Sequence, residues 1–191
     1  MRLTSLRTAG LTLAVLLLCV AAAAPAKADS FTFTGTFTYD NDVRLFNFTV
    51  AAQSQVTLRT RSYAAGGFDP VLSLFRGDGQ FLTDNDDAAP NVFDSLIVRA
   101  LDSGNYILAL TQSPNYVTGN NLSDGFTFDG DDDDNRTFAD GFGGRTGNFT
   151  LDIENVAVAT PVPEPATLMM FGGGVAALAA TLRRRRNQQQ S

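Results

Sequence analysis

Residues 31–39 read FTFTGTFTY, and the spacing of the aromatic residues in this stretch indicates the fold class. From residue 31 onward, an aromatic residue or glycine stands at every second position, with threonines in between. Alternation with a period of two is typical of a β-strand that buries one of its faces. The face expected to point into the core carries Phe31, Phe33, Gly35, Phe37 and Tyr39. The stretch therefore predicts a half-buried strand.

Similar short apolar runs recur along the chain, separated by turn residues. Further strands are expected at residues 44–50, 55–63, 70–76, 80–84, 95–101, 105–112 and 148–158. Residues 77–79, Gly-Asp-Gly, predict a tight hairpin turn, because glycine accepts a positive φ. No helical period interrupts these runs. The pattern predicts an all-β fold, an antiparallel β-sandwich or jelly roll of about 7–9 strands, with a core supplied by most of the 15 phenylalanines.

Residues 113–147 break the alternation, because they are rich in glycine, asparagine and aspartate. We expect a long loop here, with short strands at residues 125–128 and 137–138. Within it, Asp129 and Asp131–Asp134 form an acidic run. The run lacks the spacing and terminal glutamate of an EF-hand loop, so we interpret it as a solvated loop.

Residues 1–28 predict a signal peptide, a helix that is removed on export. Arg2 and Arg7 precede an apolar run, and Ala26 and Ala28 supply the small residues of a cleavage site. The mature chain is expected to start near Asp29, so that the sandwich occupies residues 29–160.

The C-terminal residues 161–191 predict a second membrane-directed segment. Ala166–Leu182 is 17 residues long without a charge, about 25 Å as a helix, the short end of what spans a bilayer. Arg183, Arg184, Arg185 and Arg186 follow and would stay in the cytoplasm as a membrane stop. A plain transmembrane anchor would need nothing more than this.

Composition excludes several functions for the exported part. Cys19 is the only cysteine and lies in the leader, and histidine is absent. Disulfides, cysteine nucleophiles and histidine bases are therefore excluded. Without the basic residues of the two ends, seven arginines stand against 20 acids, a charge of about −13. Such a surface repels phosphate backbones, so we expect no nucleic-acid partner.

Four aspartates form a candidate metal site. Asp69 precedes one strand of the predicted hairpin, and Asp84, Asp86 and Asp87 end the other. A closed hairpin brings both groups to the same end of the sheet. Oxygen ligands gathered in this way suit Ca²⁺, which is the candidate cofactor. The alternative is a solvated turn, since aspartate and asparagine favour turns for their own backbone hydrogen bonds.

Pro163, Glu164 and Pro165 stand directly before the apolar segment and the arginine cluster. This order resembles the PEP-CTERM sorting signal of Gram-negative bacteria. The resemblance implies that an exosortase, a membrane-embedded processing enzyme, reads the tripeptide and removes the span. The protein would be anchored transiently in the inner membrane after export and would then reach the cell surface or the extracellular space.

The body resembles the DVUA0089 family of PEP-CTERM proteins and, more distantly, the pre-peptidase C-terminal domains, which are β-sandwiches. FDPVLSLF, a glycine turn and DNDD carry most of this likeness. The resemblance brings no activity with it. We expect a non-catalytic protein that binds or scaffolds extracellular polymer, with exosortase and the export machinery as partners and extracellular polysaccharide as a candidate. The alternative is a secreted hydrolase or an accessory module of one, but the chain has no nucleophile motif.

Overall fold

The computed structural model describes residues 28–129, 136–138 and 143–163. The signal peptide up to residue 27, the run Asp131–Asp134, Glu164, Pro165 and everything after them lie outside the described residues. Among the residues described, no helix is long and apolar enough to cross a membrane.

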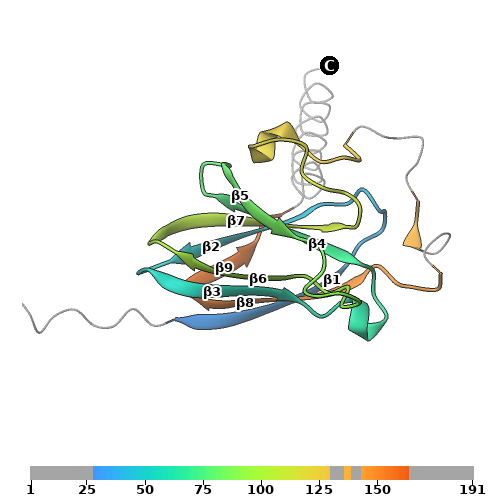
Figure 1. Ribbon diagram of the computed structural model, residues 1–191, viewed down its shortest axis with the longest axis horizontal. Coiled ribbons are helices and arrows are strands. Elements are labelled where there is room, and N and C mark those ends of the chain that lie inside the picture. The colour runs from blue at the N-terminus through green and yellow to red at the C-terminus, as the bar shows by residue number, and fades with distance from the viewer. Residues whose placement is uncertain (1–27, 130–135, 139–142, 164–191) are drawn as a thin grey trace, which may run out of the picture.

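Two antiparallel sheets pack face to face (Figure 1). The four-stranded sheet has the order β1 (Asp29–Thr36), β8 (Asn148–Val156), β3 (Ser54–Thr60) and β6 (Leu96–Leu101). The five-stranded sheet has the order β5 (Phe81–Asn85), β4 (Pro70–Arg76), β7 (Gly104–Gln112), β2 (Arg44–Val50) and β9 (Val158–Pro161). Two short 3-10 turns, η1 (Tyr63–Ala65) and η2 (Leu122–Asp124), lie in the connections. The predicted antiparallel sandwich is confirmed, and its nine described strands match the expected number.

Aromatic side chains fill the space between the sheets. Phe37 stacks on Phe68 with ring centroids 4.7 Å apart, and Phe48 stacks on Tyr106 at 5.4 Å. The opening stretch contributes as predicted up to Phe37, which is 2% exposed. These rings carry much of the apolar area that the fold removes from water.

Tyr39 does not follow the alternation, and its predicted place on the buried face is wrong. It is 40% exposed, because β1 ends at Thr36 and the chain turns away from the sheet. The Asp42 carboxylate stabilises this turn by accepting hydrogen bonds from the N–H groups of Thr38 (2.6 Å) and Tyr39 (3.1 Å). The local turn overrides the period-two pattern.

The single strand expected over residues 148–158 is divided between the two sheets. Asn155 adopts φ +63° near the end of β8, a conformation that asparagine tolerates better than most residues. After the turn, Ala157 donates its N–H to the Thr49 carbonyl (2.8 Å), and β9 begins in the other sheet. The chain thus crosses from one sheet to the other at this point.

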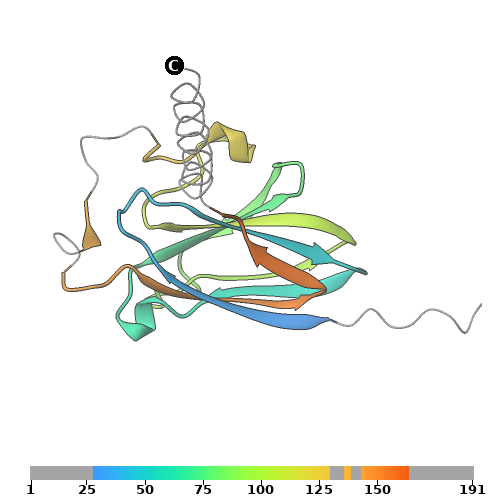
Figure 2. The same ribbon diagram turned by 180° about the vertical axis from the view of Figure 1, so that it is seen from behind.

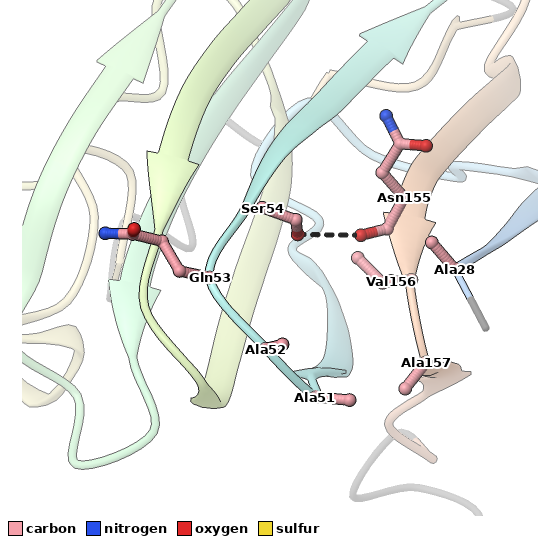
Figure 3. Close-up of a pocket in the computed structure, with 8 residues that line it drawn as sticks. All are labelled: Ala28, Ala51, Ala52, Gln53, Ser54, Asn155, Val156 and Ala157. Carbon is pink, nitrogen blue, oxygen red and sulfur yellow. Dashed lines mark hydrogen bonds between the residues drawn. The ribbon is translucent and has the colours of Figure 1, made fainter. Parts of the chain in front are cut away.

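A pocket marks the crossover (Figure 3). It encloses about 120 Å³, well below the roughly 300 Å³ at which ligand pockets begin. Ser54 already donates to the Asn155 carbonyl across it (3.2 Å). The alanines that line much of the rest offer a ligand little to bind, so we place no functional site here.

The start of the long loop covers the outer face of the five-stranded sheet. Phe126 packs there against Phe75 and Ala109, and all three are buried. The expected strands at 125–128 and 137–138 are reduced to single bridges, Val117–Phe126 and Tyr39–Thr137. The first six residues of β4 are therefore buried, because this sheet is covered on both faces.

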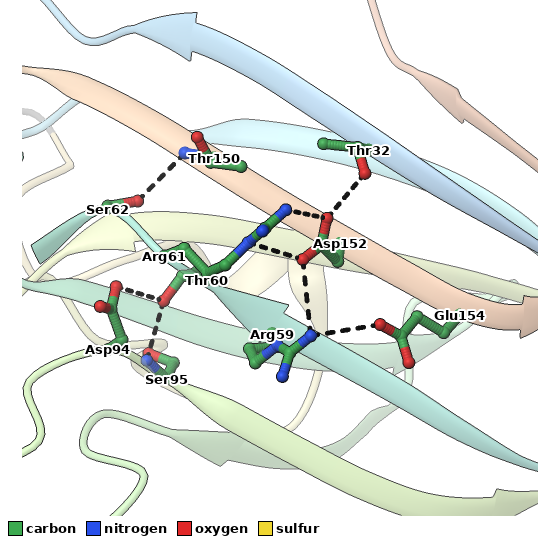
Figure 4. Close-up of polar contacts among 10 residues, drawn as sticks. All are labelled: Thr32, Arg59, Thr60, Arg61, Ser62, Asp94, Ser95, Thr150, Asp152 and Glu154. Atoms are coloured by element: carbon green, nitrogen blue, oxygen red, sulfur yellow. Dashed lines mark hydrogen bonds and ion pairs between the residues drawn. The ribbon is translucent and has the colours of Figure 1, made fainter. Parts of the chain in front are cut away.

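A charged network lies on the outer face of the four-stranded sheet (Figure 4). Asp152 of β8 accepts two contacts of 2.9 Å from the guanidinium of Arg61 and a hydrogen bond of 2.7 Å from the Thr32 hydroxyl. Arg59 lies 3.8 Å from Asp152 and 3.3 Å from Glu154. Two of the seven arginines of the exported part thus form ion pairs with acids of this sheet.

Candidate functional site

Three of the four predicted metal ligands come together at one end of the sandwich. Asp69 precedes β4, Asp86 and Asp87 follow β5, and the two strands form the predicted hairpin. One carboxylate oxygen from each of the three lies within 4.8 Å of the others. We call these three residues the acidic cluster. Asp84 is exposed within β5, where it lies opposite Ser73, and is not part of this group.

Side chains from the loop after β7 reach into the acidic cluster. The Tyr116 hydroxyl donates to Asp86 Oδ2 (2.6 Å), and the Ser113 hydroxyl donates to the same oxygen (3.2 Å). The bond to Asp86 raises the pKa of Tyr116, because the phenolic proton is held by the carboxylate. No pattern in the sequence pointed to these two residues, which stand 27 and 30 positions beyond Asp86.

The backbone of the acidic cluster is held by neighbouring strands. The Ser95 hydroxyl, which is buried, lies 2.5 Å from the Pro70 carbonyl and 2.8 Å from the Asp86 carbonyl. Ser113 donates its N–H to the Asp69 carbonyl (2.8 Å). These bonds tie β4, the end of β5 and the end of β7 together, so the carboxylates approach one another on a fixed frame.

The approach of the carboxylates is electrostatically costly. Burial raises the pKa of Asp69 from 3.8 to about 6, and the charges of Asp86 and Asp87 add to the rise. The Arg145 guanidinium opposes it. Arg145 does not pair with these acids in a described salt bridge, but lies over the Tyr63 ring, 3.2 Å from its centroid. The acidic cluster therefore holds more negative charge than its surroundings compensate.

Two carboxylate oxygens in the acidic cluster have further binding capacity. Asp69 Oδ1 and Asp86 Oδ1 are buried and have no hydrogen-bond partner among the described residues. A buried, unpaired acceptor costs free energy unless a proton or a cation satisfies it. Three carboxylates suit a hard divalent ion such as Ca²⁺, which takes six to eight oxygens, waters included, in flexible geometry.

The raised pKa of Asp69 predicts a pH-dependent stability. The folded protein binds this proton up to about pH 6, whereas the unfolded chain releases it near 3.8. The stability contributed by the protonated carboxyl is thus fully present below 3.8 and is lost as the pH rises through about 6. We expect Asp69→Asn to gain stability relative to the wild type over this window when a chelator is present.

Urea unfolding midpoints on both sides of the window measure this effect. Asp84→Asn is the matched control, because it removes an exposed carboxylate of the same hairpin, and it should follow the wild type. Parallel pH profiles of Asp69→Asn and the wild type would contradict the prediction.

The second candidate element is the segment that leads into the sorting tripeptide. β9 pairs with β2, and beyond it Val162 donates its N–H to the Leu45 carbonyl (2.8 Å). Pro163, the first residue of the tripeptide, is exposed and is the last residue that the structure describes. No spacer separates the folded sandwich from the tripeptide.

A known sorting motif matches the C-terminal part of the chain. The protein-family profile described as the PEP-CTERM protein-sorting motif matches residues 161–186. The chain therefore carries this sorting motif, and the resemblance to the PEP-CTERM sorting signal is confirmed. The match begins at the last residue of β9.

Among solved structures, the pre-peptidase C-terminal domain of a collagenase from Bacillus anthracis is similar to this chain. The two share 11% sequence identity with a TM-score of 0.39, over 72% of this chain and 98% of that domain. No curated protein sequence matches the chain.

Proposed function

We propose that this chain is an exosortase-processed protein of the cell surface or extracellular matrix, with a non-catalytic sandwich that binds or scaffolds extracellular polymer. The sorting motif at residues 161–186 carries this proposal, because it implies export, a membrane-anchored sorting signal and exosortase as the partner. The body ahead of it is acidic and has no histidine, and no cysteine lies beyond the leader. Extracellular polysaccharide is the proposed polymer.

We further propose that the acidic cluster binds Ca²⁺. The observation that favours this is the pair of buried, unpartnered oxygens on Asp69 and Asp86, within a group of three carboxylates. Asp87, which is exposed, would face the solvent side of the ion. Calcium would offset the burial and the repulsion that together raise the pKa of Asp69, and it would fix the loop that carries Tyr116.

A secreted hydrolase is the competing function. A glycosidase needs two carboxyl groups across a cleft, one of them with a raised pKa, and Asp69 beside Asp86 partly meets this requirement. However, the Oδ1 atoms of both are closed to solvent, and Asp86 Oδ2 already accepts from Tyr116 and Ser113. Release of reducing ends from polysaccharide by the purified protein, lost in Asp69→Asn, would replace the non-catalytic proposal.

Mass spectrometry of the native extracellular protein tests the processing. We expect no peptide from residues 166–191, because the processing enzyme removes the span together with the arginine cluster. Deleting the tripeptide Pro163-Glu164-Pro165 should leave the full tail on a membrane-bound protein. Intact tail on the extracellular form from an exosortase-competent host would contradict the proposed function.

A further inference from the structure

We propose that the processing enzyme engages β9 and Val162 as an extended segment that has left the sheet, so that recognition includes a strand of the sandwich as well as the tripeptide. This inference rests on the proposed function. It follows from how the sheet holds β9 and from how little chain separates β9 from the membrane segment.

β9 is an edge strand with few buried atoms. It lies beside β2 at the end of the strand order, as Figure 2 shows from behind. Of its four side chains only Ala159 is buried, at 7% exposure, and Val158 is 51% exposed. By contrast, Leu151, Ile153 and Val156 of β8 are fully buried. Releasing β9 therefore exposes little apolar surface, which makes it a candidate for local opening.

Backbone hydrogen bonds to β2 also flank this segment at both of its ends. The Thr49 carbonyl accepts from Ala157 ahead of β9, and the Leu45 carbonyl accepts from Val162 behind it. Pro161 has no N–H to give to either side, which is tolerated at a sheet edge. The segment is held by its backbone, and exchanging those bonds for bonds to another strand would cost little.

The short reach of the chain after β9 favours release of this strand. From Val162 to Ala166, where the predicted span begins, four residues extend at most about 14 Å. With β9 in the sheet, the tripeptide can therefore enter a membrane-embedded enzyme only if the whole sandwich is drawn against it. Release back to Ala157 gives nine residues and about 30 Å. The enzyme can then bind the tripeptide with several extended residues ahead of it.

A disulfide between β9 and β2 tests this inference, because the mature chain has no cysteine of its own. Asn47 and Thr160 are exposed register partners. Their spacing as a hydrogen-bonded antiparallel pair, about 5.5 Å between Cα atoms, suits a disulfide. In an exosortase-competent host, Asn47→Cys with Thr160→Cys should form the bond after export and keep its tail. Reduction should restore processing to the wild-type rate.

The matched control fixes β2 to β7 and leaves β9 free. Thr49 and Asn105 are register partners whose side chains already meet at 2.9 Å. Thr49→Cys with Asn105→Cys should be processed like the wild type. Processing of the oxidised β9 variant at the wild-type rate would overturn the inference, and so would an equal block in the control. An unprocessed wild type would instead refute the proposed function.

Discussion

Phe37→Ala is expected to lower the free energy of unfolding by about 3–5 kcal/mol, the range for removing a buried phenylalanine. The Phe37 ring is 2% exposed, stacks on Phe68 at 4.7 Å and lies 5.6 Å from the Phe149 ring. The Arg44 guanidinium lies 5.1 Å from its centroid. Truncation leaves a cavity where both sheets meet the turn after β1, and the neighbouring rings cannot collapse into it fully.

Denaturant unfolding of the processed protein measures this loss. Tyr39→Ala is the matched control, since Tyr39 belongs to the same alternating stretch but is 40% exposed. We expect the control to change stability by less than about 0.5 kcal/mol. A loss below about 1 kcal/mol for Phe37→Ala would mean that the core does not close around this ring.

Calcium binding is expected to give the second largest change in the stability of the folded protein. An ion that binds only the folded state stabilises it by RT ln(1 + [L]/Kd), about 2.7 kcal/mol at a hundredfold excess over Kd. This corresponds to a rise of roughly 5–10 °C in Tm for a domain of this size. Thermal unfolding in millimolar Ca²⁺, compared with NaCl of equal ionic strength, measures the specific part of the effect.

Two exposed aspartates of the same hairpin separate a site from general screening. Asp87→Asn removes a member of the acidic cluster and should abolish most of the calcium response. Asp84→Asn removes a carboxylate outside the acidic cluster and should leave the response intact, as should neutralising Asp131–Asp134. An equal Tm shift in Ca²⁺ and NaCl would show only screening among like charges.

The sequence predicted the strands where local pattern and tertiary context agree. The expected bounds 44–50 and 70–76 are those of β2 and β4, because turn residues stand at both ends of each apolar run. The exposure of Tyr39 and the break in the expected strand at Asn155 were not predicted, and both have the same physical reason. In each case the chain leaves its sheet at a turn whose stabilising contacts, such as that of Asp42, do not depend on alternation.

Only the part of the candidate site that the β4–β5 hairpin brings together could be predicted from the sequence. Closing β4 on β5 brings Asp69 to Asp86 and Asp87, and the turn residues showed that closure. Tyr116 reaches the acidic cluster because β7 lies next to β4, a neighbour relation set by the order of strands in the sheet. Period and composition do not encode that order. For the same reason, the position of β9 beside β2 could not be predicted from the sequence.

The register places the acidic cluster at the end of the sandwich from which the tail departs. Pro70 lies opposite Gln112, Arg44 opposite Leu110, and Phe46 opposite Pro161. Under the proposed function, the tripeptide and the predicted span follow this end of the sandwich, so we infer that this end is the nearer one to the membrane before processing. An anionic lipid surface repels carboxylates and concentrates divalent cations within about a Debye length. Cleavage would move the acidic cluster into bulk solution, so its ion occupancy would come to follow the extracellular calcium concentration instead of that at the lipid surface.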